Sequence, residues 1–142
     1  MRRRLFLKDA CSLCIAAGAG LLSGGLISCS SYSVYRTRVQ DAEITVPLSI
    51  FSTGPLQILR ADDIEYDIAV RQNTDGSFLA LLLRCTHADN EVVPAGQGFA
   101  CSVHGSRFDA HGEVTRGPAP ERLQTLDTSV SSDRLTVHLT RK

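Results

Sequence analysis

The chain has no excess of charge of either sign. Its 142 residues include 15 Lys or Arg and 15 Asp or Glu, so the formal net charge is zero. After the first residues, Lys and Arg form no long run, which argues against nucleic acid as a partner. The chain is also more hydrophobic than disordered chains are, because 43% of its residues are hydrophobic. The length suits one domain preceded by a short leader.

Helical periodicity is missing after Cys29, and no internal repeat is visible. Short runs rich in Val, Ile, Leu, Thr and Phe instead alternate with turn residues. The expected strands are residues 34–39, 43–46, 56–59, 66–71, 78–83, 99–102, 107–108, 122–126 and 135–140. The second ends before Pro47, because proline lacks a backbone donor. This pattern predicts an all-β fold, an antiparallel sandwich or small barrel, in which the doubly apolar run 78–83 is a central strand covered on both faces.

The first 28 residues have the layout of an export signal. Residues 3–8 read RRLFLK and precede an uncharged stretch at 11–27. The hexapeptide resembles the twin-arginine motif RRxFLK, whose pathway carries folded proteins, often with a cofactor already inserted. The alternative is an ordinary secretory signal with a basic start. Either signal predicts an exported protein that faces the periplasm or the cell exterior.

The sequence LISC at residues 26–29 resembles a bacterial lipobox. Such signals are cut before the cysteine, which then carries lipid, so Cys29 would anchor the chain to a bacterial membrane. Residues 29–35 would be a spacer and 36–142 the folded domain. The alternative keeps the apolar segment uncleaved as a membrane helix, although 17 residues lie at the short edge of the spanning range.

Two short segments concentrate the metal-binding residue types of the chain. Cys85 and His87 are two positions apart, and Cys101 and His104 are three apart. Thiolates hold iron in bridged iron–sulfur clusters, and imidazole is a ligand of both iron and zinc. The pattern C-x-H…C-x-x-H, followed by HGSRFD and by Gly-Pro-Ala at 117–119, resembles the Rieske iron–sulfur family over roughly residues 83–126.

The resemblance implies one [2Fe–2S] cluster per chain, with Cys85 and Cys101 on one iron and His87 and His104 on the other. Replacing two thiolates by neutral imidazoles removes negative charge and raises the reduction potential. A structural zinc site with the same four ligands is the alternative, but such sites usually open with two cysteines. The two other histidines, His111 and His138, are interpreted as ordinary surface residues.

The resemblance also places Gly105, Ser106, Phe108 and Pro118 around the cluster. The high-potential branch has a Ser and a Tyr whose hydroxyls donate to the cluster; Ser106 matches the Ser, whereas Phe108 replaces the Tyr. This predicts an intermediate potential. Pro118 belongs to a segment that resembles the family's proline loop, which packs over the cluster. The alternative is that Pro118 only forms a turn.

That branch further carries two extra cysteines, which form a disulfide between the cluster loops. Asn90 and Val103 stand at those positions, so no such disulfide is expected. Of the five cysteines, Cys11 and Cys14 would leave with the signal, Cys29 would be lipidated, and the remaining two would bind iron.

The sequence therefore predicts an exported, membrane-anchored one-electron carrier whose partners are redox proteins or quinol. No flavin motif or nucleophile–base pair stands out, so the chain is not expected to be an enzyme by itself. One alternative is a subunit of a larger respiratory oxidoreductase, quinol-oxidising or arsenite-oxidase-like. Another is a zinc-stabilised lipoprotein.

Overall fold

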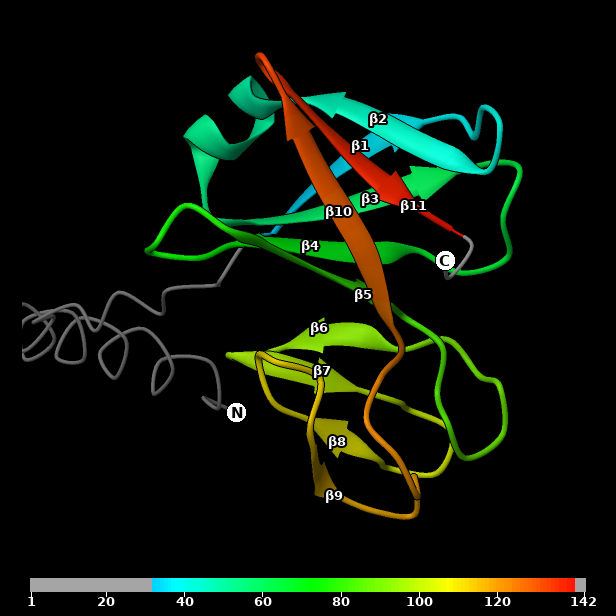
Figure 1. Ribbon diagram of the computed structural model, residues 1–142. Helices are drawn as coiled ribbons and strands as arrows, with labels where there is room; N and C mark the ends of the chain where they lie inside the picture. Colours follow the sequence, from blue (N-terminus) through cyan, green and yellow to red (C-terminus); the bar gives the residue numbers. More distant parts are fainter. Residues whose placement is uncertain (1–31, 140–142) are drawn as a thin grey trace, which may run out of the picture.

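The computed structural model describes residues 32–139, which form strands and one short 3₁₀ helix, η1 (Leu48–Thr53) (Figure 1). The strands are β1 (Ser33–Thr37), β2 (Glu43–Pro47), β3 (Leu56–Ala61), β4 (Ile68–Gln72), β5 (Phe78–Leu82), β6 (Val93–Ala95), β7 (Gly98–Ala100), β8 (Arg107–Phe108), β9 (Val114–Arg116), β10 (Thr125–Ser131) and β11 (Arg134–His138). The predicted all-β class is confirmed. No helix in this range is long and apolar enough to cross a bilayer. The expected signal and Cys29 lie outside the described residues.

The main sheet has the strand order β1-β3-β4-β5-β10-β11-β2. Its pairs are antiparallel except that β1 runs parallel to β3. One face of these strands supplies a single apolar core, in which Ile44 and Val46 of β2 meet Leu59 of β3. Tyr35 of the other edge strand, β1, packs against the same core. Because both edges of the sheet contribute to one core, the sheet is curled and nearly closed.

The smaller sheet, β6-β7-β8-β9, is antiparallel throughout and lies below the main sheet in Figure 1. A second core fills the space between the two sheets. Ile58, Ala69 and Leu81 reach it from the other face of β3, β4 and β5, and Phe99 and Phe108 reach it from the small sheet.

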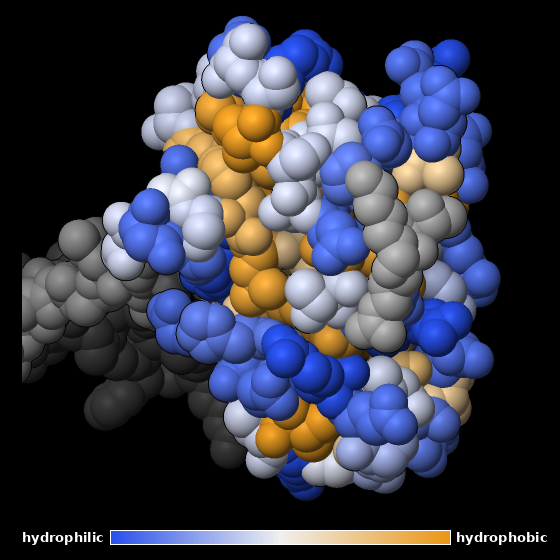
Figure 2. All heavy atoms as spheres, viewed as in Figure 1, coloured by the Kyte–Doolittle hydropathy of each residue, from blue (hydrophilic) through white to orange (hydrophobic). Residues whose placement is uncertain are grey.

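Strand β5 is shared by the two cores because side chains alternate along a strand. Ala80 is 0% exposed in the first core, and its neighbour Leu81 is 2% exposed in the second. The prediction of a central strand covered on both faces is confirmed. On the surface seen in Figure 2, hydrophobic residues gather over each of the two sheets, and the surface between these two areas is mostly hydrophilic.

Several element bounds differ from the sequence prediction. Strand β1 begins at Ser33, so the expected spacer 29–35 overlaps the sheet; Tyr35 is held there by the main core. Pro47 is the last residue of β2, where a missing donor costs little. The strand expected at 122–126 instead starts at Thr125 and runs to Ser131, because it pairs with β11 over that length. Helix η1, β6 and β9 were not expected.

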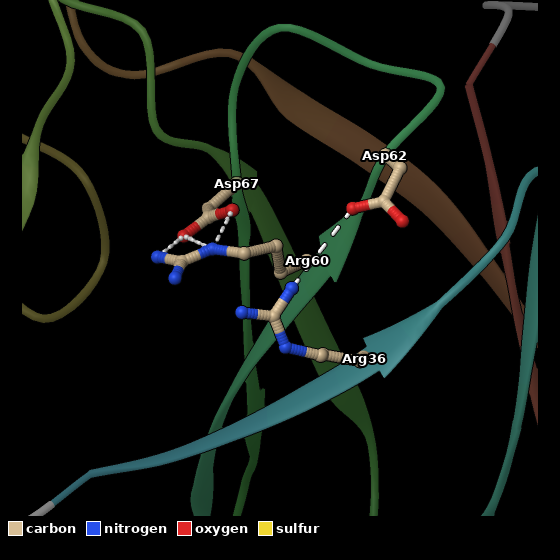
Figure 3. A network of polar contacts seen from close by, with 4 residues as sticks. All are labelled: Arg36, Arg60, Asp62 and Asp67. Atoms are coloured by element: carbon tan, nitrogen blue, oxygen red, sulfur yellow. Dashed lines mark hydrogen bonds and ion pairs between the residues drawn. The ribbon is translucent and has the colours of Figure 1, made fainter.

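The parallel pairing of β1 and β3 places two arginines side by side. Arg36 and Arg60 are Cα partners, and each binds its own aspartate (Figure 3). Arg60 Nε and Nη2 donate to the carboxylate of Asp67 at 3.0 and 2.6 Å. The Arg36 to Asp62 contact is 3.9 Å and is exposed. The hydrogen bonds that Arg60 donates to Asp67, together with the negative charge of that carboxylate, raise the pKa of Arg60.

Candidate metal centre

The four predicted ligands lie in two loops with the same backbone hydrogen bonds. In the first loop, which follows β5, the amide of Cys85 donates to Asn90 O at 2.8 Å, and the amide of Asp89 donates to Cys85 O at 3.0 Å. In the second loop, between β7 and β8, the amide of Cys101 donates to the carbonyl of Ser106 at 2.9 Å, and that of Gly105 to the carbonyl of Cys101 at 3.1 Å. The pairing therefore joins the same relative positions in each loop.

Both loops reverse direction at a residue with positive φ, four positions after the cysteine. These residues are Asp89, at φ 52°, and Gly105, at φ 79°. Asp tolerates this conformation better than most side chains, and glycine adopts it without steric cost. Gly105 therefore has a backbone role, since it lets the second loop turn back onto Cys101. The cysteine and histidine of each loop lie within one such turn.

The cysteines and histidines occupy different environments. Cys85 and Cys101 are each 1% exposed and belong to the second core, between the sheets. His87 and His104 are exposed at the outer end of the loops. Both cysteines are free thiols rather than members of a disulfide. The chain thus presents two sulfurs on the protein side and two imidazoles on the solvent side.

The two imidazoles face each other through the same ring atom. Their Nδ1 atoms are 3.2 Å apart, and the ring planes are nearly perpendicular, at 86°. Two nitrogens bound to one tetrahedral metal at about 2.0–2.1 Å are separated by about 3.3 Å. The observed spacing therefore fits two imidazoles on a single metal atom. Among residues 32–139, no three Cys, His, Asp or Glu side chains gather around one point.

A third loop, residues 117–121, is hydrogen-bonded to both of the loops that contain the cysteines. Ser106 is 0% exposed, and its Oγ accepts the buried amide of Ala119 at 3.0 Å. Thr86 Oγ1 donates to the carbonyl of Glu121 at 2.6 Å. A hydroxyl that accepts one hydrogen bond keeps its own hydrogen to donate, so Ser106 can also donate to a neighbour. Pro118 itself is exposed, next to buried Ala119.

Two contacts at this centre were not anticipated from the sequence. Thr86 stands between the first cysteine and histidine, and its bond to the 117–121 loop spans 35 positions of sequence. Tyr66 donates its hydroxyl to the carbonyl of Asp89 at 2.6 Å, which braces the first loop from the β3–β4 connection. Desolvation, aided by Glu65, raises the pKa of Tyr66. Side-chain bonds to distant backbone atoms leave no local signal in sequence.

The remaining predicted site residues lie outside the two ligand loops. Phe108 is 3% exposed and packs in the second core with both cysteines. His111 is exposed, in a turn where its amide and that of Glu113 donate to Asp109 Oδ1. His138 is half-buried rather than free on the surface.

His138 links three neighbouring strands of the main sheet. Its Nδ1 is 2.9 Å from Glu43 Oε1 on β2, and its Nε2 is 2.9 Å from Ser129 Oγ on β10. The side chain of His138 is 23% exposed. It therefore has a structural contact that the alternating strand pattern did not predict.

Three comparisons with known proteins agree on the class of this site. The family model described as "Rieske [2Fe-2S] domain" matches residues 52–127. The cytochrome b6-f complex iron-sulfur subunit of Synechococcus sp. (strain WH7803) is 46% identical over 56 residues, which cover 37% of this chain and 31% of that protein. The same subunit of Synechococcus sp. (strain CC9605) is 38% identical over 78 residues, 53% of this chain and 43% of that protein.

Among solved structures, the cyanobacterial plasma membrane Rieske protein PetC3 from Synechocystis PCC 6803 superposes with a TM-score of 0.53 at 26% identity. The match covers 64% of this chain and 93% of PetC3. A chain from the complex of reduced oxygenase and oxidized ferredoxin in carbazole 1,9a-dioxygenase gives a TM-score of 0.52 at 20% identity, covering 72% of this chain and 98% of that one. The latter likeness concerns the fold alone. The segments that match the two curated relatives span less than half of the length of those proteins.

Proposed function

Because the chain belongs to the Rieske [2Fe–2S] family, we propose that it is an exported, membrane-anchored carrier that passes single electrons between redox partners. Family membership implies a [2Fe–2S] cluster and supports a role in electron transfer. It also sets aside the zinc alternative.

The proposed ligands are Cys85 and Cys101 on one iron and His87 and His104 on the other. The observation that carries this assignment is the 3.2 Å separation of the two Nδ1 atoms, which suits binding to one metal atom. Both thiols belong to the second core, so they face the protein rather than solvent. A cluster held this way supplies a site that gains or loses one electron at a raised potential.

The protein's own residues set the environment of that site. The second core keeps water away from the sulfur ligands, while the exposed imidazoles leave one edge open to a partner. Ser106 is held in place by Ala119 and retains a hydroxyl hydrogen that can be donated toward the cluster. Phe108 has no hydroxyl to donate. One donor in place of two favours a potential between the extremes of the family.

Anchoring is proposed through lipid at Cys29, or through an uncleaved N-terminal helix. The RRLFLK and LISC motifs support export and lipidation, and PetC3 is described as a plasma membrane protein. Cell fractionation of the full chain tests this. Cys29→Ser should move the protein from the membrane to the soluble exported fraction. If the variant stays in the membrane fraction, the uncleaved helix is the anchor.

The cluster assignment is tested by iron and acid-labile sulfide analysis, with electron paramagnetic resonance of the dithionite-reduced protein. The expected result is two irons and two sulfides per chain and the signal of a mixed His/Cys cluster. Cys101→Ser should abolish that signal. Cys29→Ser is the matched control, since it removes a cysteine outside the proposed ligand set and should leave the cluster content unchanged. A full cluster signal in Cys101→Ser would contradict the ligand assignment.

A subunit role in a larger oxidoreductase is the second candidate, because the curated relatives are described as subunits of the cytochrome b6-f complex. There the cluster would relay electrons to another cofactor, and quinol would be the donor. The two candidates differ in whether other chains co-purify with this one after mild detergent extraction. Recovery of the chain alone favours the independent carrier.

A further inference from the structure

Arg71 is a charged residue at the end of a buried strand face. It is the fourth residue of β4, and alternation places it on the side of Ala69, which belongs to the second core. Its register partners on β3 and β5 are Leu56 and Leu79, both of which pack against that core. The guanidinium group therefore leaves an apolar layer between the two sheets.

Arg71 has an enclosed donor without a partner and makes no ion pair in the described part of the chain. Within residues 32–139, its Nε is the one enclosed side-chain nitrogen or oxygen with no hydrogen-bond partner. Arg60, Arg84 and Arg122 each lie within 4 Å of a carboxylate, whereas Arg71 has no such contact in the described part of the chain. An enclosed donor without a partner is unusual in folded proteins and requires an explanation.

A cavity of about 180 Å³ opens beside Arg71. Its walls come from three places: the start of β3 with Pro55 and Leu56, strand β6 and the turn after it with Pro94 and Gln97, and Tyr32 before β1. None of the residues that line it is acidic, so Arg71 is the sole charged group there. A pocket with mostly uncharged walls and one guanidinium is suited to an anion, because the planar donors of Arg match carboxylate and phosphate oxygens.

We propose that this cavity between the two sheets binds a phosphate oxyanion through Arg71. This proposal uses the anchor at Cys29 proposed above. Tyr32, in the cavity wall, follows Cys29 by three residues, and a chain of three residues spans at most about 11 Å. The cavity would therefore lie close to the lipid. The phosphate group of an anionic phospholipid would then be the nearest anion to the cavity. Inorganic phosphate is the other source of the same chemical group. Binding there would fix the orientation of the domain on its membrane.

The test uses the full, cluster-loaded chain in non-ionic micelles at constant ionic strength. One arm titrates inorganic phosphate by calorimetry, and the other adds micelles that contain phosphatidylglycerol. Saturable binding in either arm is expected, and Arg71→Gln should weaken it by roughly tenfold or more. Arg36→Gln is the matched control. It removes the same charge from an exposed arginine that does not line the cavity. It should bind as the original chain does.

The two arms and a second variant separate the outcomes. Phospholipid binding that depends on Arg71 supports the lipid source, and phosphate binding alone supports the site with the free anion. Arg71→Lys keeps the charge and removes the planar donors, so it should bind more weakly than the original chain but more tightly than Arg71→Gln. Equal affinity of the original chain and Arg71→Gln in both arms, with cluster absorbance intact, would overturn the proposal. Fractionation of Cys29→Ser reports on the anchor separately.

Discussion

The hydrogen bond from Ala119 to Ser106 gives a prediction that the structure makes quantitative. Ser106→Ala removes the acceptor of an amide on a residue that is 6% exposed, at a site where the serine itself is 0% exposed. A buried donor left without a partner costs about 1–3 kcal/mol. In a domain of this size, that loss lowers the unfolding temperature by about 4–15 °C. The midpoint potential should fall as well, because the same hydroxyl is the proposed donor to the cluster.

Ser102→Ala is the matched control for this experiment. Ser102 lies in the same loop but is exposed, so its replacement should change neither the unfolding temperature nor the potential. Unfolding followed by the visible absorbance of the cluster, with amide exchange at Ala119, measures the first effect, and redox titration measures the second. If both serine variants unfold at the same temperature and Ala119 exchanges no faster, the hydrogen bond does not stabilise the site as argued.

Three further predictions concern other parts of the domain. Phe108→Tyr adds a hydroxyl donor and should raise the midpoint potential by several tens of millivolts, since 59 mV corresponds to roughly 1.4 kcal/mol for one electron. A redox titration that finds an unchanged or lowered midpoint potential would contradict this prediction. Gly98→Ala places a Cβ against the backbone oxygen of Phe108 and should cost more than about 2 kcal/mol of unfolding free energy in denaturant titrations, whereas Gly54→Ala, which meets open space, should not. Partial desolvation opposes ionisation of Asp109, but amide hydrogen bonds from Glu113 and His111 outweigh it and lower its pKa. A lowered folded-state pKa gives stability that is present above the unfolded value and lost as pH falls through the folded value. The stability advantage of the original chain over Asp109→Asn should therefore shrink in unfolding curves taken below about pH 4; a constant difference speaks against it.

The fold class and the central strand were predictable because they depend on local patterns. The alternation in residues 135–139 and the apolar run at 78–83 both follow from which faces are buried. The short strands β6 and β9 were missed because three residues contain too little periodicity to recognise. Helix η1 and the parallel β1–β3 pair depend on packing against the main core, which sequence spacing does not reveal.

The candidate site was predictable only as a set of residues. The order and spacing of Cys85, His87, Cys101 and His104 made them the predicted ligands, and the structure brings the two histidines together. The connections that hold the loops together were not visible in the sequence. The bonds of Thr86 to Glu121 and of Ser106 to Ala119 join positions 35 and 13 residues apart. The motif pointed to Ser106 as a donor to the cluster, but nothing in it indicated the bond to Ala119, and no motif pointed to Thr86.

The division into two cores explains how a domain of this size can do without a disulfide between the two loops that contain the proposed ligands. The main core contains none of the proposed ligands and closes the large sheet by itself. The second core contains both cysteines, and the strands of the small sheet are only two or three residues long. Strands this short are paired over only two or three residues each, so the small sheet depends on whatever joins its loops. Metal binding contributes folding free energy directly, and a cluster with ligands from both loops would provide that link. The same four residues would then hold the electron carrier and stabilise the part of the fold that surrounds it.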